Sequence, residues 1–154
     1  LPKEFISLVN RSNSQAARIP LKYLQDRGVT QKDIFQWKIG YCPTGKFGGR
    51  IVIPSFSLSG RANYFIARSY KKGGYRYMNP DASRDIVFNH LYLDFDEDLT
   101  IVEGVFDAIM IDGVGILGSE ISNKQKLQID ALNRKVIIVP DRDKAGSKLI
   151  NQAC

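Results

Sequence analysis

Acidic residues follow two apolar runs of this chain, and they are the side chains best placed to do chemistry. Glu103 ends the β-branched run 99–102, while Asp141 and Asp143 follow the run 136–139. Runs of valine and isoleucine of this length predict buried strands of a parallel sheet. Ligands of open α/β sheets bind just beyond the carboxyl ends of the strands. We therefore expect the three carboxylates to gather at one edge of a sheet.

Three clustered carboxylates repel one another unless a cation lies between them. Their hard oxygen atoms favour Mg²⁺ or Mn²⁺, so Glu103, Asp141 and Asp143 are candidate metal ligands. Asp107, four residues after Glu103, is a further candidate ligand, although the same carboxylate could instead cap the helix that begins there. In the competing interpretation all four are polar residues of loops that follow strands. Two separate strands that end in acids favour the metal site.

The spacing of apolar residues after residue 98 predicts strands that alternate with helices, which is typical of an α/β sandwich. The predicted strands are 99–103, 114–117 and 135–140, and the predicted helices are 106–111, 122–133 and 144–153. Ser122, with Gln125 three residues later, predicts a capping box at the start of the second of these helices.

The first part of the chain carries signals of short helices followed by an antiparallel meander. Pro20 predicts the first turn of a short helix that Gly28 ends. Thr30 with Asp33 predicts a capping box for a second helix, which runs through Trp37. Turn residues separate three predicted strands, 51–56, 61–70 and 75–79, and a helix is expected over 83–90.

The net charge of +6 is concentrated in the first part of the chain. Residues 1–98 hold fifteen basic and nine acidic side chains, whereas residues 99–154 hold seven of each. No acid occurs between Asp33 and Asp81, a stretch with eight basic residues and ten of the sixteen aromatic ones. Basic residues interleaved with aromatic ones suit a polyanion whose bases can stack. The alternative is a solvated basic face over an aromatic core, but the length of the acid-free stretch favours nucleic acid.

Composition and motifs exclude several classes of protein. Charged residues make up 25% of the chain and no apolar run approaches the length of a membrane span, which predicts a soluble protein. The two cysteines, Cys42 and Cys154, form no zinc-binding pair and suit a reducing cytoplasm. The single histidine, His90, cannot supply a Ser-His-Asp or Cys-His set. No G-x-x-x-x-G-K-[ST] motif of a nucleotide-driven motor occurs.

The acidic residues also carry a resemblance to a known family. The resemblance to the Toprim domain, which DnaG-type primases share with topoisomerases and some nucleases, rests on Glu103-Gly-x-x-Asp107, Gly118-Ser119 and Asp141-x-Asp143-x-Ala145-Gly146. An upstream block resembles the polymerase core of DnaG-type primases alone, in Tyr23-Leu24-x-x-Arg27-Gly28, Ile39-Gly40-Tyr41-Cys42-Pro43, Gly49-Arg50-Ile51-x-Ile53-Pro54 and Arg76-Tyr77-x-Asn79-Pro80. The family usually has lysine where this chain has Arg76.

This resemblance implies an α/β fold with two parts. An α+β basic subdomain, residues 1–98, would precede a Toprim parallel α/β sheet, residues 99–154. Because the chain begins with leucine and not methionine, we expect a fragment. The family's Toprim domain continues past the helix that follows the Asp-x-Asp motif, whereas this chain stops at Cys154, so the resemblance implies a Toprim domain truncated at its C-terminus.

The activity that the resemblance implies is that of a DNA primase, a nucleotidyltransferase that makes short RNA primers on single-stranded DNA for DNA replication. Glu103, Asp141 and Asp143 would be catalytic and would hold Mg²⁺ or Mn²⁺, with Asp107 as a further metal ligand. The implied contacts to nucleic acid or nucleotide are Arg50, Arg68, Arg76, Tyr77, Asn79 and Lys144.

The resemblance also implies partners and a location. Besides the single-stranded DNA template, the partners would be ribonucleoside triphosphates and a replicative helicase, with no membrane involved. The location would be the cytoplasm of a bacterium or of a phage-infected host. A Toprim-type nuclease that cuts with the same metal site, and a nucleic-acid-binding fragment that is inactive on its own, are the alternatives.

Overall fold

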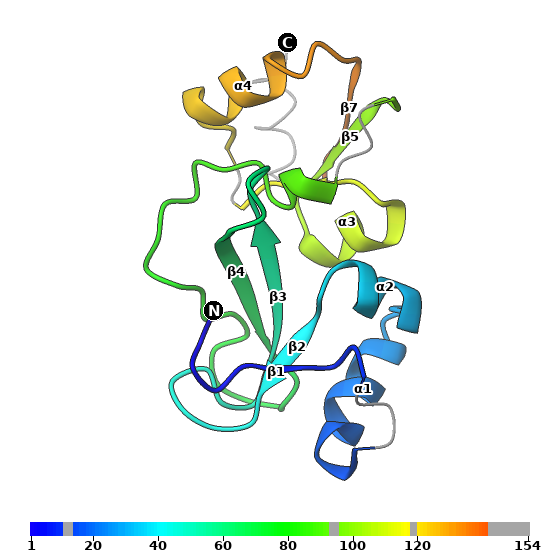
Figure 1. Cartoon of the computed structure of the whole chain (residues 1–154), viewed down its shortest axis with the longest axis vertical. Helices are drawn as coiled ribbons and strands as arrows, with labels where there is room; N and C mark the ends of the chain where they lie inside the picture. Colours follow the sequence, from blue (N-terminus) through cyan, green and yellow to red (C-terminus); the bar gives the residue numbers. More distant parts are fainter. Residues whose placement is uncertain (11–13, 93–95, 118–119, 142–154) are drawn as a thin grey trace. The chain divides into compact units, whose positions relative to one another are not determined.

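The computed structural model describes residues 1–10, 14–92, 96–117 and 120–141 (Figure 1). The chain folds as two compact units. The first comprises Leu1–Ser55 and Ala62–Asp81, and the second comprises Phe56–Arg61 and Ala82–Cys154. The domain boundary after residue 98 stays a prediction.

A four-stranded sheet forms the first unit, in the order β1-β2-β3-β4. The strands are β1 (Ile6–Ser7), β2 (Gly40–Cys42), β3 (Arg50–Phe56) and β4 (Ala62–Ser69). β2 runs antiparallel to both β1 and β3. Gly40 has to be glycine, because a Cβ atom there would overlap the Phe5 ring and the carbonyl oxygen of Ile6. The first two strands of the predicted meander are therefore present, extended by β1 and β2.

The prediction of a third meander strand over residues 75–79 is wrong. Only an isolated antiparallel bridge forms there, between Arg68 and Tyr77. The backbone N–H of Ser69 donates to Arg76 and that of Met78 donates to Ala67. Pro80, shortly afterwards, has no N–H to donate, which limits further pairing in that direction.

Two short helices complete the first unit, and their caps are those predicted. A 3-10 turn, Gln15–Ala17, leads into α1 (Arg18–Gln25), and α2 spans Gln31–Gln36. After α1 the chain reverses through Gly28, whose φ is +79°. The Thr30 hydroxyl accepts from the Asp33 N–H at 3.2 Å, and the Asp33 carboxylate accepts from the Thr30 N–H at 2.7 Å. Both predicted helices are confirmed.

One hydrophobic cluster of the first unit surrounds a cysteine. Cys42 packs with Val52, Phe65 and Ala67, and the ring of Phe47 meets that of Phe65 edge-on at 5.0 Å. Burial, followed by the charge of Glu4, raises the pKa of the Cys42 thiol to about 11. The thiol is therefore protonated at neutral pH and acts as a small apolar side chain.

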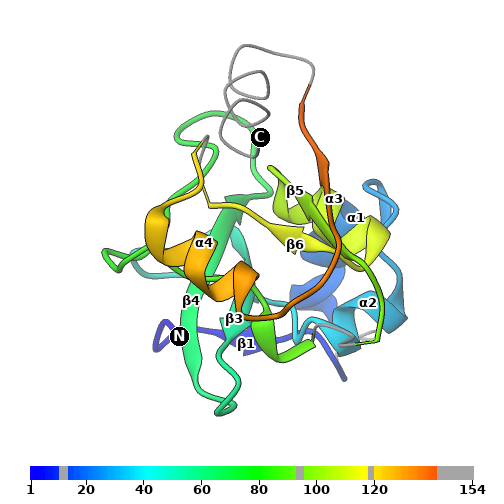
Figure 2. The ribbon, with the colours of Figure 1, turned by 90° about the horizontal axis from the view of Figure 1, so that it is seen from above.

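The second unit contains the predicted parallel sheet, in the order β6-β5-β7. The strands are β5 (Leu99–Val102), β6 (Val114–Gly115) and β7 (Val136–Val139), and β5 pairs in parallel with both neighbours. β5 is buried as predicted, but the predicted burial of 136–139 is wrong, because three of the four residues of β7, an edge strand of this sheet, are exposed. The helix α3 (Val105–Ile111) packs against β5 and β6 (Figure 2). The helix α4 (Asn123–Asp130) begins with the predicted capping box of Ser122 and Gln125. The predicted helix 144–153 lies outside the described residues.

The helix predicted over 83–90 is wrong. The described chain there is irregular, with a single 3-10 turn, His90–Tyr92, at its end. Its backbone groups bond to side chains of α4 instead of to a helical ladder, as the Gln125 amide donates to the carbonyls of Arg84 and Ile86. Tertiary hydrogen bonds therefore replace the local ones.

None of the helices within the described ranges is long and apolar enough to cross a membrane.

Candidate functional site

The ends of β5 and β7 bring two of the predicted acids together. Val102 pairs with Val139, so the residues that follow leave the sheet side by side. The backbone N–H of Asp141 donates to a carboxylate oxygen of Glu103 at 3.1 Å. Glu103 is half-buried and Asp141 is exposed. The parallel register therefore places both residues at the carboxyl edge of the sheet.

Two of the predicted site residues, Asp143 and Lys144, lie outside the described residues. Within the described ranges, no three histidine, cysteine or acidic residues are grouped closely enough to hold a metal ion. The metal site that the sequence predicts with three carboxylates therefore stays a prediction.

Asp107 lies in the first turn of α3, against the residue that precedes the helix. Gly104 is the N-cap residue of α3 and offers no side chain to the free N–H groups. The Asp107 carboxylate fills the space that a side chain at Gly104 would need. A negative charge at this position favours the helix through its dipole. This contact supports a structural role for Asp107, and its role as a metal ligand stays a prediction.

Among the described residues, no lysine or arginine forms an ion pair with the acids at the carboxyl edge of the sheet. In the described part of the second unit, ion pairs join Arg134 to Asp96 and Lys135 to Asp98. Neither pair involves Glu103 or Asp141. The backbone contact brings Glu103 and Asp141 together, neither forms an ion pair within the described residues, and carboxylate oxygens are the ligands that hard divalent ions prefer. The chemistry of these residues therefore fits Mg²⁺ or Mn²⁺.

Arg68 lies on β4 in the first unit, and two tyrosines from other segments hold its side chain. Its Nε donates to the hydroxyl of Tyr23 at 3.0 Å. Its Cζ atom lies 4.5 Å from the centre of the Tyr77 ring, which is 44% exposed. This cation–π arrangement holds the guanidinium plane against the ring. Tyr77 and Arg68, which are both predicted nucleic-acid contacts, therefore touch each other.

Arg50 is used differently, because it ties two turns together. Nη1 donates to the carbonyl of Gly48 at 3.0 Å, and Nη2 donates to the carbonyl of Tyr75 at 3.3 Å. Its Nε is buried and has no hydrogen-bond partner among the described residues. Both terminal nitrogens of this guanidinium therefore already donate to carbonyl groups of the protein.

Of the remaining predicted nucleic-acid contacts, Arg76 has an exposed side chain and Asn79 is bonded within the protein. The side chain of Arg76 is exposed to solvent. The backbone carbonyl of Arg76 accepts from the Ser69 N–H. The Asn79 side chain accepts from the Ala67 N–H at 3.4 Å. Asn79 therefore helps to hold the segment after the bridge against β4.

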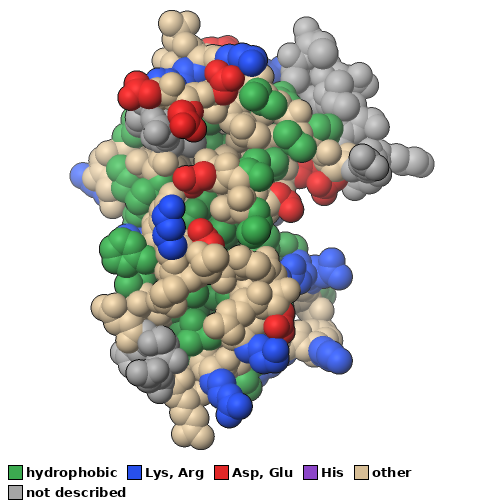
Figure 3. Space-filling view, turned by 90° about the vertical axis from the view of Figure 1, so that its right-hand side faces the viewer, with side chains coloured by type: hydrophobic (Ala, Val, Ile, Leu, Met, Phe, Trp, Pro, Cys, Tyr) green, Lys and Arg blue, Asp and Glu red, His purple; other side chains and the backbone are tan. Residues whose placement is uncertain are grey.

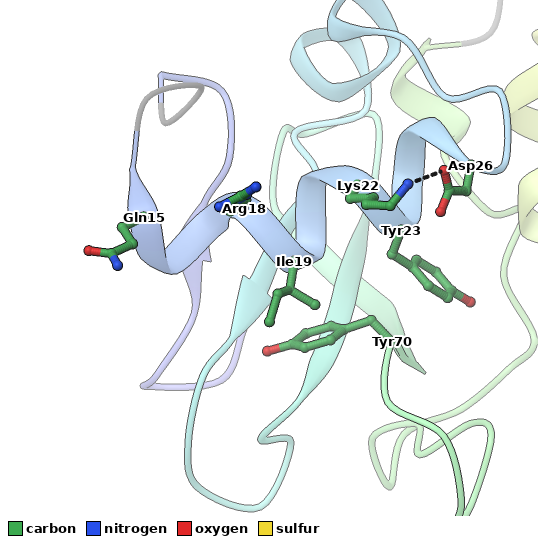
Figure 4. Close-up of a pocket in the computed structure, with 7 residues that line it drawn as sticks. All are labelled: Gln15, Arg18, Ile19, Lys22, Tyr23, Asp26 and Tyr70. Carbon is green, nitrogen blue, oxygen red and sulfur yellow. Dashed lines mark hydrogen bonds and ion pairs between the residues drawn. The ribbon is translucent and has the colours of Figure 1, made fainter.

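A pocket of about 560 Å³ lies beside α1 in the first unit (Figure 4). Its walls are formed by Gln15, Arg18, Ile19, Lys22, Tyr23, Asp26 and Tyr70. Lys22 and Asp26 form an exposed ion pair at 3.0 Å, and burial raises the pKa of Tyr70. Sequence reasoning did not single out this pocket or the contact of Tyr23 with Arg68. No local pattern signals either feature. The four-residue spacing of Tyr23 and Arg27 accounts only for the contact of the Arg27 Cζ atom with the Tyr23 ring, at 4.8 Å.

Comparisons with known proteins find the same architecture in primases. The DNA primase of Thermotoga maritima is 27% identical over 172 residues, an alignment that covers 80% of this chain and 30% of that protein. The E. coli primase catalytic core superposes with a TM-score of 0.81 at 19% identity, covering 94% of this chain and 62% of that chain. The Aquifex aeolicus primase, solved with its zinc-binding and RNA polymerase domains, gives 0.77 at 21% identity and covers 93% and 47%. No family model matches the sequence.

The fold is therefore that of the catalytic core of DnaG-type primases, and the α/β class expected from the sequence is confirmed. In sequence, the chain is similar to the DNA primase of Thermotoga maritima. It spans about a third of the length of the curated primase it matches and about three fifths of the E. coli core.

Proposed function

We propose that this chain is part of the polymerase core of a DNA primase, which makes short RNA primers on single-stranded DNA. The observation that carries the proposal is the meeting of Glu103 and Asp141 at the carboxyl edge of the sheet in a primase-core fold. The similarity covers 94% of the chain and so includes the basic first unit. A Toprim-type nuclease would need only the acidic edge, so this coverage favours the primase over the nuclease.

Primer synthesis joins two nucleotides. A 3′-hydroxyl attacks the α-phosphate of a ribonucleoside triphosphate, and pyrophosphate leaves. In the proposal, Glu103, Asp141 and Asp143 hold Mg²⁺ or Mn²⁺, with Asp107 beside them. When bound, the divalent ion stabilises negative charge on the attacking and leaving oxygens.

The chain's own basic and aromatic residues would position the nucleic acid. Arg68, and with it Arg50 and Arg76, would neutralise phosphates of the template or of the incoming nucleotide. The exposed ring of Tyr77 would offer a face on which a base stacks. Lys144 would contact the triphosphate.

Partners and location belong to the same proposal. A DnaG primase catalytic domain has been solved bound to single-stranded DNA, and it covers 94% of this chain at 18% identity and a TM-score of 0.79. We infer the same template here, together with ribonucleoside triphosphates and a replicative helicase. Replication in a bacterium or a phage-infected host would place the protein in the cytoplasm.

The test is synthesis on single-stranded DNA with labelled ribonucleotides and either Mg²⁺ or Mn²⁺. It is run with this chain and with any longer protein that contains it. We expect labelled RNA of short length that disappears when the metal is chelated. Degradation of an end-labelled template without RNA synthesis would favour the nuclease. Binding without either reaction in both forms of the protein would favour a binding module.

A further inference from the structure

We infer that Tyr23 is a positioning residue, which fixes the guanidinium of Arg68 so that its terminal nitrogens face a nucleic-acid phosphate. The inference rests on the proposed function, because it assigns a partner to Arg68. The two residues lie 45 positions apart, on α1 and β4, and the hydroxyl of Tyr23 accepts from Arg68 Nε at 3.0 Å. Tyr23 is half-buried, so its ring is held by the first unit.

The choice of nitrogen decides what Arg68 can still bind. A guanidinium has five N–H groups, and bidentate phosphate binding uses two that lie parallel on one edge. Tyr23 occupies Nε. In the described part of the chain, Nη1 and Nη2 of Arg68 have no recorded hydrogen bond. The edge formed by Nη1 and Nη2 is therefore the one left for a phosphate.

Two stacking contacts restrict the remaining freedom of this group. The Tyr77 ring lies against the Arg68 guanidinium, with 4.5 Å between Cζ and the ring centre. Arg27 lies in the turn after α1, and its Cζ atom is 4.8 Å from the centre of the Tyr23 ring. Cations and rings therefore alternate in the order Arg27, Tyr23, Arg68, Tyr77. A side chain held at both its Nε and its plane loses less conformational entropy when it binds a phosphate.

Arg50 provides the contrast within the same unit. Its terminal nitrogens already donate to the carbonyls of Gly48 and Tyr75. No such contact is recorded for the terminal nitrogens of Arg68 among the described residues. The geometry thus assigns the stronger phosphate contact to Arg68 and makes Tyr23 the residue that orients it.

A double-mutant cycle tests the inference. Binding of a fluorescent oligothymidylate is measured for wild type, Tyr23→Phe, Arg68→Ala and the double variant, over a range of salt concentrations. Tyr23→Phe removes one hydroxyl and should weaken binding about fivefold, the scale of one hydrogen bond. Arg68→Ala should weaken it about thirtyfold, the scale of a charged hydrogen bond. In the Arg68→Ala background, Tyr23→Phe should change affinity less than about twofold.

The salt dependence separates positioning from direct charge contact. Arg68→Ala should reduce the slope of log affinity against log salt by about 0.7, as for one lost contact to a single strand. Tyr23→Phe keeps the charge of Arg68 and should change the slope less. The Arg68 Nε–H resonance in ¹⁵N NMR should broaden by faster solvent exchange in Tyr23→Phe, because its acceptor is gone.

Tyr64→Phe is the matched control. Its hydroxyl is buried without a hydrogen-bond partner among the described residues, so removing it should leave affinity and the Arg68 resonance unchanged. Equal weakening by Tyr23→Phe with and without Arg68 would overturn the inference, since Tyr23 would then act through something else. Normal binding by Arg68→Ala would also overturn it. Primer synthesis by the wild type judges the proposed function separately.

Discussion

At the scale of single residues, the acidic edge depends on charge more than on shape. Asp141 donates its backbone N–H to Glu103, and this bond is independent of the Asp141 side chain. Asp141→Asn keeps that bond and the side-chain volume but removes one negative charge. If Asp141 holds a catalytic ion, primer synthesis should fall by at least about a hundredfold, the scale of losing one preorganised electrostatic contact. Primer yield per unit time measures this loss.

The same variant should affect binding and stability in other ways. Single-stranded DNA affinity should persist, because the basic stretch between Asp33 and Asp81 is untouched. The thermal midpoint should hold or rise, since one source of repulsion in the metal-free edge is removed. Asp130→Asn, at the end of α4, is the matched control and should leave synthesis unchanged. Normal synthesis by Asp141→Asn would remove Asp141 from the essential ligands.

At the scale of elements, α4 stabilises the second unit through buried amides. Gln125 is 5% exposed, donates to the carbonyls of Arg84 and Ile86, and accepts from the Ser122 N–H at 2.9 Å. Gln128 adds a bond to the Asp85 carbonyl at 3.2 Å. The helix therefore holds an irregular segment that has no backbone hydrogen-bond ladder of its own.

Gln125→Leu should lower the free energy of unfolding by about 3 kcal/mol, because two carbonyls and one N–H lose their partners in a buried place. Urea denaturation followed by circular dichroism measures this change. Lys124→Leu, the exposed neighbour on the same helix, is the control and should change it by less than about 0.5 kcal/mol. Similar losses in the two variants would show that the amide bonds contribute little.

At the scale of the whole molecule, charge is divided unequally along the chain. Residues 1–98 carry a basic excess of six, while residues 99–154 are neutral. Lysine and arginine side chains are exposed in the lower part of the view in Figure 3. Because phosphate neutralisation releases counterions, single-stranded DNA binding should weaken steeply as salt rises.

Replacing Arg50, Arg68 and Arg76 together with alanine should weaken binding and reduce the salt slope by about 2, at about 0.7 per lost contact. Fluorescence anisotropy at several salt concentrations measures both quantities. The control replaces Lys124, Lys126 and Lys135, which lie outside the acid-free stretch, and should leave the slope nearly unchanged. Thermal melting checks that the loss of the Arg50 bonds has not unfolded the first unit. Unchanged affinity in a folded arginine variant would remove this surface from DNA binding.

Features that depend on neighbours along the chain could be predicted from the sequence. The capping boxes at Thr30 and Ser122 formed as predicted, because their partners lie three residues away. The parallel strands followed from runs of valine and isoleucine, which favour extended chain. Burial did not follow for both runs, since β5 is buried whereas Val136, Ile137 and Val139 of β7 are exposed. Glu103 and Asp141 met at the sheet edge because parallel strands end on the same side.

Features that depend on residues far apart in the chain could not be predicted from local sequence patterns. The segment 83–90 is no helix because amides of α4, about forty positions later, bond its carbonyls. Tyr23 and Arg68 meet across 45 positions, and no local pattern of either residue encodes that contact. Such bonds form only after loop closure, whose entropy cost is offset by the packing of whole elements. For that reason local patterns predicted the elements, whereas the hydrogen bonds that orient Arg68 required the structure.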